Sequence, residues 1–427
     1  MTAAERFKRL FEFRPAAPRS LKPGLYHFLR VSAGVQTRFH LRAEPDGYGL
    51  LLANASLAAR LSPAGALIAH SLLSGQSEAT VLRALGETFR GAGRAELERD
   101  VARLRDLITT LQVPGDGAPV LNLDDAAWLD RPRQFLAPLQ ADVPLAPPEQ
   151  LRPVIARLWE IGVPQVTISV PASPDRAHLV QAVERAEDTG LICGVRGRAS
   201  DLRAAGLLPD LARAGLDHVN LYYASDQPEP HDRLLGAGDH AAAHAGWAEA
   251  QALELYPVAE VPLVEATLPR LTETLSDLRA RGVLDCAVFA IAEIVETPDD
   301  AVGAEALPQA AALVEEAAEA SRVRYLWHPP VRRNPALSLA EQVRRGPRCS
   351  GDVAMRVEPD GAVFAPRGPR HSAGNLLTTS WDEIWAHPVF QRYRERLQAV
   401  TRCDRCPGLT VCAADCPREP AGWAEEA

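Results

Sequence analysis

The sequence predicts an α/β protein with three parts. Strand-like and helix-like segments alternate between residues 149 and 328, which is typical of a parallel sheet, either open or closed into a partial (β/α)6 barrel. Before them, a hairpin followed by three amphipathic helices predicts a small βββααα, winged-helix-like domain. After them, four of the seven cysteines fall within residues 403–416 and predict a metal-binding region.

Composition and charge limit the class of protein. At 427 residues, about three domains are expected, and 47% hydrophobic and 24% charged residues are ordinary for a globular chain. The longest apolar runs are too short to span a membrane, and a net charge of −9 argues against a nucleic-acid surface. The start, MTAAERFKRL, lacks an apolar signal segment, and the cysteine usage suggests a reducing cytoplasm. We therefore expect a cytoplasmic protein, with neither a membrane nor a nucleic-acid partner.

The first domain is expected over residues 1–112. Strands are predicted at residues 26–31, 38–43 and 48–54, with a hairpin turn at Asp46-Gly47. Helices are predicted at residues 64–73, 78–90 and 94–111, the first two capped by Ser62 and Ser77. Residues 113–133, rich in Pro and Gly, are interpreted as a linker.

The middle part, residues 134–345, alternates regularly. Strands are predicted at residues 165–170, 191–196, 218–224, 255–264, 286–294 and 324–328. Helices are predicted at about residues 149–161, 176–189, 201–214, 239–252, 267–281 and 305–321. Folds of this kind bind ligands at the carboxyl ends of their strands.

The last part, residues 346–427, is less regular. A hairpin is predicted at Asp360-Gly361, a helix from Trp381 to Leu397, and then the spacing C-x2-C-x5-C-x3-C at Cys403, Cys406, Cys412 and Cys416. Four thiolates this close can hold Zn²⁺ or an iron–sulfur cluster. Buried structural cysteines or a redox pair are the alternative.

The first domain resembles the PqqD-like peptide-recognition element of ribosomal-peptide maturation, on the stretch LLLANASLAARLSPAGALIAHSLLSGQS and the three helices. The resemblance implies that a leader or precursor peptide adds as a strand to the third strand and lies along the third helix. The implied edge is residues 48–54. Candidate peptide-binding residues are Tyr48, Leu50, Leu51, Leu52 and Arg103. An accessory domain with a covered edge is the alternative.

The last part resembles the SPASM extension of radical S-adenosylmethionine (SAM) enzymes. Cys349, Gly361, the stretch GNLL, the stretch DEIW and the four terminal cysteines carry the resemblance. The extension normally holds two 4Fe–4S clusters, but Pro366 stands in place of one cysteine and none follows Cys416. The resemblance therefore implies one 4Fe–4S cluster, with Zn²⁺ as the alternative, held by Cys403, Cys406 and Cys412. Cys416 or a solvent or substrate ligand would complete it, and Cys349 is a further candidate ligand.

The middle part resembles the radical SAM barrel, on ARLWEIGVPQVTIS and ARAGLDHVNLYYASDQPEPHDRLLGAG. Its catalytic features are missing. Residues 135–148, near the first barrel strand, contain no C-x3-C-x2-C motif, and residues 170–173 read Val-Pro-Ala-Ser in place of Gly-Gly-Glu-Pro. Ala224 stands in place of an acidic residue. We therefore expect no catalytic residue and no bound SAM.

Other reactive side chains are interpreted as structural. His240 and His244 are expected to form a surface pair on a helix, and Tyr222 and Tyr223 to pack in a core. Isolated strand cysteines, Cys193 and Cys286, are expected to be buried hydrophobes. His231-Asp232-Arg233 is expected to be a structural loop.

These features predict a degenerate radical-SAM-like protein that is not expected to be an enzyme itself: a peptide-binding chaperone or scaffold in ribosomal-peptide or peptide-cofactor maturation. Its second partner would be an active radical SAM enzyme. Two alternatives stay open. The chain could be a peptide-modifying enzyme that uses its remaining cluster, or an iron–sulfur electron carrier.

Overall fold

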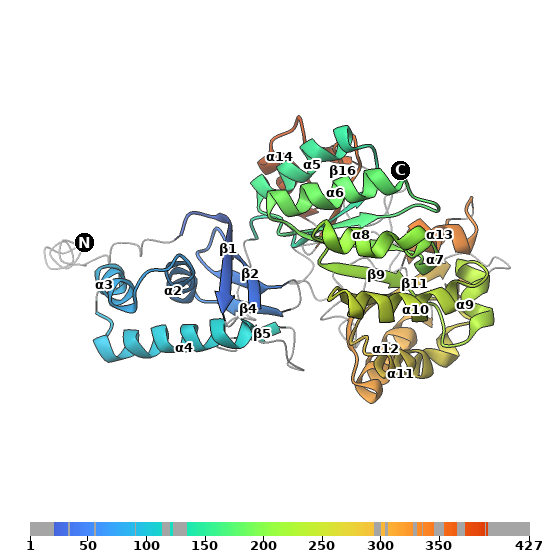
Figure 1. The fold of residues 1–427 in the computed structure, drawn as a ribbon, viewed down its shortest axis with the longest axis horizontal. Coiled ribbons are helices and arrows are strands. Elements are labelled where there is room, and N and C mark those ends of the chain that lie inside the picture. The colour runs from blue at the N-terminus through green and yellow to red at the C-terminus, as the bar shows by residue number, and fades with distance from the viewer. Residues whose placement is uncertain are drawn as a thin grey trace, which may run out of the picture. The chain divides into compact units, whose positions relative to one another are not determined.

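The computed structural model describes residues 21–32, 35–54, 57–89, 91–112, 120–122, 135–293, 300–303, 306–327, 331–334, 336–345, 354–364, 372–388 and 390–391. Residue contacts divide the chain into two units, Met1–Leu136 and Ala137–Ala427 (Figure 1). The predicted limits of the linker and of the C-terminal region stay predictions.

The first unit contains one sheet and three helices. Its strands are β1 (Gly24–Ser32), β2 (Val35–Ala43), β3 (Gly49–Ala53), β4 (Leu57–Leu61) and β5 (Val120–Asn122), in that order across the sheet. Strands β1 to β4 form an antiparallel meander, and β5 pairs parallel to β4. Its helices are α2 (Pro63–Leu73), α3 (Glu78–Thr88) and α4 (Arg94–Gln112).

Local chemistry explains where these helices begin. The Ser62 side chain accepts a hydrogen bond from the Gly65 amide, and Pro63 follows at the first helical position of α2. Ser77 accepts in the same way from the Thr80 amide at the start of α3. The predicted N-caps are confirmed. Apolar residues of all three helices pack with β2, β3 and β4 in one buried core.

The expected bare edge at residues 48–54 is wrong. Strand β3 pairs with β2 along one edge, Leu51 facing Leu41, and with β4 along the other, Leu51 facing Ala59. Its backbone N–H and C=O groups are therefore used in the sheet, and a peptide cannot add beside Leu50, Leu51 or Leu52 as a further strand. The sequence reasoning missed β4 and so placed the end of the meander one strand too early.

The second unit is organised around a mostly parallel sheet. Strands β6 to β11 lie side by side in chain order and are parallel: β6 (Gln140–Pro144), β7 (Gln165–Ser169), β8 (Ile192–Gly197), β9 (His218–Tyr222), β10 (Tyr256–Leu263) and β11 (Asp285–Glu293). Strands β12 (Val302–Gly303), β13 (Arg324–Trp327) and β14 (Val331–Arg332) all pair with β11.

Helices follow the parallel strands. They are α5 (Pro148–Ile161), α6 (Arg176–Thr189), α7 (Ala199–Leu202), α8 (Leu207–Arg213), α9 (Pro228–Leu235), α10 (Asp239–Ala252), α11 (Leu271–Ala280), α12 (Leu307–Ser321) and α13 (Leu339–Arg345). The helix expected at residues 201–214 is interrupted by a 3-10 turn, Ala204–Gly206. His231-Asp232-Arg233, expected in a loop, lies in α9.

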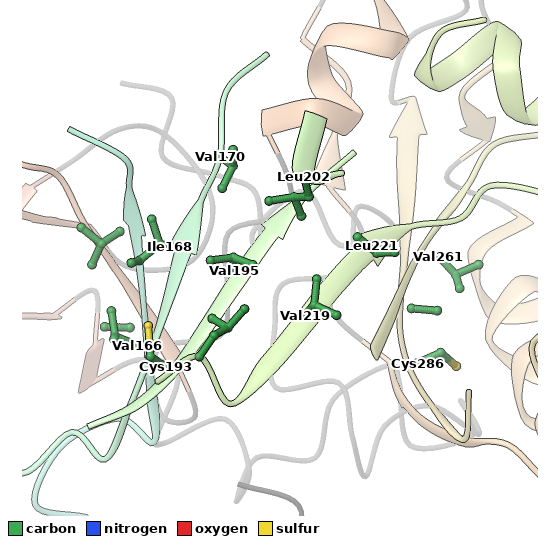
Figure 2. Close-up of a cluster of buried hydrophobic side chains, with 14 of the residues drawn as sticks. Val166, Ile168, Val170, Cys193, Val195, Leu202, Val219, Leu221, Val261 and Cys286 are labelled. Carbon is green, nitrogen blue, oxygen red and sulfur yellow. The ribbon is translucent and has the colours of Figure 1, made fainter. Parts of the chain in front are cut away.

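The two faces of the parallel sheet differ in chemistry because successive strand residues point to opposite sides. One face carries apolar side chains such as Ile168, Val195 and Leu221, which pack with the helices in a large core (Figure 2). The other face, called here the polar face, carries Asp142, Arg196 and the polar residues between them, described below.

C-terminal segments extend the same sheet. Strand β15 (Ala354–Val357) pairs parallel to β6, and β16 (Ala362–Phe364) and β17 (Ser372–Asn375) continue it. The hairpin predicted at Asp360-Gly361 is confirmed. Helix α14 (Trp381–Ala386) begins at a capping box formed by Ser380 and Glu383.

Candidate functional site

The centre of the polar face is an ion network across five strands. The Arg196 guanidinium on β8 donates two hydrogen bonds to Asp142 on β6, at 2.9 and 3.1 Å, and one to Glu260 on β10, at 2.9 Å. All three residues are at most 3% exposed. Strands β7 and β9 lie between the partners. Charges this deeply buried persist only when paired, so the network holds the sheet in one arrangement.

A chain of amides and one imidazole continues this network. Asn220 donates through Nδ2 to Glu260 at 2.8 Å, so its Oδ1 accepts from His218 Nδ1 at 2.7 Å. His218 Nε2 then accepts from the Gln165 amide at 2.9 Å. This geometry requires a neutral imidazole, and burial lowers the pKa of His218 in agreement with it.

Gly194 on β8 makes room for this histidine. A Cβ built on Gly194 would lie 1.9 Å from the His218 ring. The ring therefore covers the backbone of the neighbouring strand, and only glycine fits beneath it. The polar face thus carries paired charges, while among the described residues Glu260 Oε2 is buried without a hydrogen-bond partner.

The position expected for a catalytic cluster is a very short connection. Strand β6 ends at Pro144 and helix α5 begins at Pro148, so three residues, Leu-Ala-Pro, join them. The Leu145 amide donates to the Ser169 carbonyl at 2.9 Å, which ties this connection to the end of β7. A loop with three thiolates for one cluster does not fit there.

The next connection also lacks a ligand for SAM. In the Val-Pro-Ala-Ser stretch after β7, Val170 donates its amide to the Arg196 carbonyl, and Ser173 donates its amide to Asp201 Oδ1 at 3.1 Å. No carboxylate stands among these four residues. Ala224, after β9, is buried, and its amide donates to His231 Nδ1. The donor set at these strand ends does not fit the catalytic cluster or its cofactor.

Two described cysteines are structural, as predicted. Cys193 on β8 and Cys286 on β11 lie in the apolar core, separated by β9 and β10 (Figure 2). Burial raises the pKa of the Cys286 thiol well above its usual range, so it stays protonated. Both thiols are buried. Within the described segments, no three His, Cys, Asp or Glu side chains are grouped to hold a metal ion.

The other candidate metal ligands cannot be placed. Cys349, Cys403, Cys406, Cys412 and Cys416 all lie outside the described residues.

The expected surface pair, His240 and His244, lies on α10, but both rings pack against Tyr223. Tyr223 donates its hydroxyl to Asp277 at 2.6 Å and accepts from His244 Nε2 at 3.0 Å, while His240 Nε2 donates to the Asp226 carbonyl at 3.1 Å. Burial lowers the pKa of His244 to about 4 and raises that of Tyr223. All of these side chains tie β9 to α10 and α11. Tyr223 and Tyr222 are buried, as predicted.

The first unit offers a separate candidate binding surface. A cleft of about 60 Å³ lies where β4 meets α2 and α4. Its lining consists of Leu61, Ser62, Ala64, Gly65, Ile68, Asp100, Arg103 and Leu104. The lining of the cleft mixes apolar side chains with the Ser62 hydroxyl and with one side chain of each charge on α4. Arg103, a predicted peptide-binding residue, therefore lies on a concave surface, whereas Tyr48 and the β3 residues do not line it.

The C-terminal part matches a known domain family. Residues 349–407 match the model of SPASM, an iron–sulfur cluster-binding domain. The match contains Cys349, Cys403 and Cys406 and ends before Cys412. No curated protein matches the chain.

The fold resembles that of SuiB from Streptococcus suis. SuiB bound to S-adenosylmethionine is 11% identical, covers 88% of this chain and 93% of its own, and superposes with a TM-score of 0.54. SuiB bound to the precursor peptide SuiA is 12% identical, with the same coverage and a TM-score of 0.52. The likeness concerns the fold, and it confirms the expected α/β architecture. Among the described helices, none combines the length and apolar character needed to cross a bilayer.

Proposed function

We propose that this chain is a catalytically degenerate radical-SAM-like protein that binds a precursor peptide and presents it to an active radical SAM enzyme. The observation that carries the loss of catalysis is the three-residue connection between β6 and α5. Reductive cleavage of SAM needs a 4Fe–4S cluster with one open iron, held by three thiolates. The connection has none, and hard oxygens such as those of Asp142 are poor cluster ligands.

The polar face supports the same conclusion. Arg196 pairs with two carboxylates, and the His218 ring covers Gly194, so side chains of the chain itself lie on this face of the sheet. Opening this face would leave buried charges unpaired, which is strongly unfavourable.

The first unit supports the peptide-binding half of the proposal. Because β3 pairs along both edges in the antiparallel meander, the peptide site moves one strand along, to the edge of β4 that pairs with the short strand β5 and to the cleft at its end. Residues at alternate positions of β4, Ala59 and Leu61, are buried on the helix-covered side. A peptide strand paired in register with β4 would therefore place one of its side chains beside Ala59. The side chain two residues further along the peptide would face the cleft near Arg103. The cleft suits a small aliphatic side chain.

We propose the same metal-binding role for the terminal cysteines that the sequence predicts. Cys403, Cys406, Cys412 and Cys416 would hold one 4Fe–4S cluster, with Zn²⁺ as the other metal that suits four thiolates, and Cys349 is the further candidate ligand. The SPASM match over residues 349–407 favours iron–sulfur. It also supports a second candidate function, an iron–sulfur electron carrier.

The test is a calorimetric titration of the anaerobically purified full chain with the precursor peptides encoded beside its gene. We expect saturable binding of one of them, weakened at least about tenfold by Ala64→Phe, which fills the cleft. Tenfold corresponds to about 1.4 kcal/mol, the scale of one anchoring side chain. Ala84→Phe, on the exposed surface of α3, is the matched control and should bind normally.

Two outcomes would contradict the proposal. Absence of binding by every such peptide, with a redox-active cluster present, would favour the electron carrier. Binding that Ala64→Phe and Ala84→Phe leave equally intact would remove the cleft from the site.

A further inference from the structure

The outer edge of β4 already has an occupant. Strand β5, which follows α4 in the chain, pairs parallel to β4 with Ala58 facing Val120, Ala59 facing Leu121 and Arg60 facing Asn122. The chain's own Val120–Asn122 therefore lies where an added peptide strand would have to pair. This pairing shows that the edge of β4 accepts an extended chain segment as a further strand.

The pairing of β5 is short compared with the rest of the sheet. It spans three residues, whereas β3 and β4 pair over five and β1 and β2 over nine. Parallel pairs are also slightly less stable per residue than antiparallel ones. Among the described strands of this unit, β5 is the one whose loss would disturb the fewest backbone hydrogen bonds while leaving the antiparallel meander whole.

We propose that β5 is an exchangeable internal strand that competes with the peptide for the edge of β4. The inference rests on the proposed peptide-binding function and adds its regulation. The bound peptide would replace Val120–Asn122 along β4 and extend to Leu61 and the cleft. Because β5 is tethered to α4 in the same chain, it returns whenever the peptide leaves.

The competition has a calculable effect on affinity. A peptide binds only the fraction of molecules in which the edge is free, so its apparent dissociation constant rises by the inverse of that fraction. A β5 strand docked for about nine-tenths of the time lowers the apparent affinity about tenfold. A substitution that weakens the pairing of β5 with β4 should therefore raise the apparent affinity for the peptide about tenfold, without adding any contact to the peptide.

The experiment uses the full chain and a labelled synthetic peptide with the chain's own sequence GAPVLNLDD, residues 117–125. Binding is measured by fluorescence anisotropy for the unchanged chain, for Leu121→Pro and for the control Ala127→Pro. Proline in β5 removes a backbone donor and disfavours pairing. We expect Leu121→Pro to bind the probe at least about tenfold more tightly than the other two proteins.

A second measurement follows the site itself. Hydrogen exchange at the β4 amides should speed up in Leu121→Pro and slow down again when the probe is added, whereas β3 amides should not change. Equal probe affinity in all three proteins, or no probe binding to any, would overturn the inference. Neither result would touch the proposed function, because that is tested separately with the precursor peptides.

Discussion

Arg196 on β8 donates to both carboxylate oxygens of Asp142 on β6, across the intervening strand β7. The same guanidinium reaches Glu260 on β10 in the other direction. One side chain therefore connects the first, third and fifth of six parallel strands. Its planar, multiply donating head suits this role, and a lysine could not replace it.

Replacing Arg196 with Met should lower the free energy of unfolding by about 3–5 kcal/mol, because it leaves two buried carboxylates without their cation. Urea denaturation followed by circular dichroism measures the change. Arg157→Met, which removes an exposed α5 pair with Glu160, is the control and should cost less than about 1 kcal/mol. Equal effects of the two substitutions would show that the network contributes nothing specific.

Gly194→Ala tests the contact between β8 and His218. The new methyl group would overlap the imidazole ring, so the ring must leave its bonds to Asn220 and Gln165. We expect a loss of about 2–4 kcal/mol, from overpacking and from the unpaired buried polar groups.

The matched control for that substitution is Gly86→Ala in α3, where a Cβ meets no atom within 4 Å. Alanine is the better helix former, so stability should rise by about 0.5–1 kcal/mol. A Gly194→Ala protein as stable as Gly86→Ala would contradict the packing described for His218.

The burial of His244 predicts acid sensitivity. Its pKa is lowered to about 4 from an ordinary value of 6.5, chiefly because burial disfavours the imidazolium, with Arg281 adding to the effect. As the pH falls, the unfolded chain therefore binds a proton at this histidine before the folded chain does, which favours unfolding. The free energy of unfolding is thus at its full value above about pH 6.5 and decreases towards pH 4.

His244→Gln should flatten the dependence of unfolding free energy on pH in this window, by at most about 1.4 kcal/mol per pH unit. Denaturant titrations between pH 4.5 and 7.5 measure the slope. His178→Gln, an exposed histidine on α6, should keep the original slope. An unchanged slope in His244→Gln would contradict the packing of this cluster.

The terminal cysteines predict one metal centre per chain. Anaerobically prepared protein should contain about four iron and four sulfide per chain, and Cys406→Ser should release them and loosen the C-terminal region, since ligand binding supplies folding free energy there. Iron, sulfide and zinc analysis measures this. Cys193→Ser, a buried core residue, should keep its metal. Two full clusters per chain, or a disulfide without metal, would contradict the prediction.

Periodicity predicted most helices and strands close to their observed bounds, because apolar residues repeat along each element. Strand β4 was not predicted because its sequence, Leu-Ala-Ala-Arg-Leu, has little preference for strand structure. It is a strand because it pairs with β3. That one omission misplaced the peptide edge. Helix α9 was not predicted because its sequence begins with two prolines, which a helix tolerates in its first turn.

The ion network could not be predicted from sequence spacing, because its members lie far apart in the chain and meet only through the strand register. A signal did exist: Asp142, Arg196 and Glu260 each interrupt an apolar strand, and a charge in such a strand requires a partner. The lack of cysteine in residues 135–148, in contrast, is read directly from the sequence, and the loss of catalysis inferred from it stays a prediction.

The proposed loss of radical SAM catalysis is tested most directly by incubating the anaerobically reconstituted chain with SAM and dithionite and measuring 5′-deoxyadenosine. Because the three-residue connection after β6 contains no cysteine, we predict no 5′-deoxyadenosine above a control without protein. Formation above that control, retained in Cys406→Ser, would contradict the proposed function, because it would require a catalytic cluster away from the terminal cysteines.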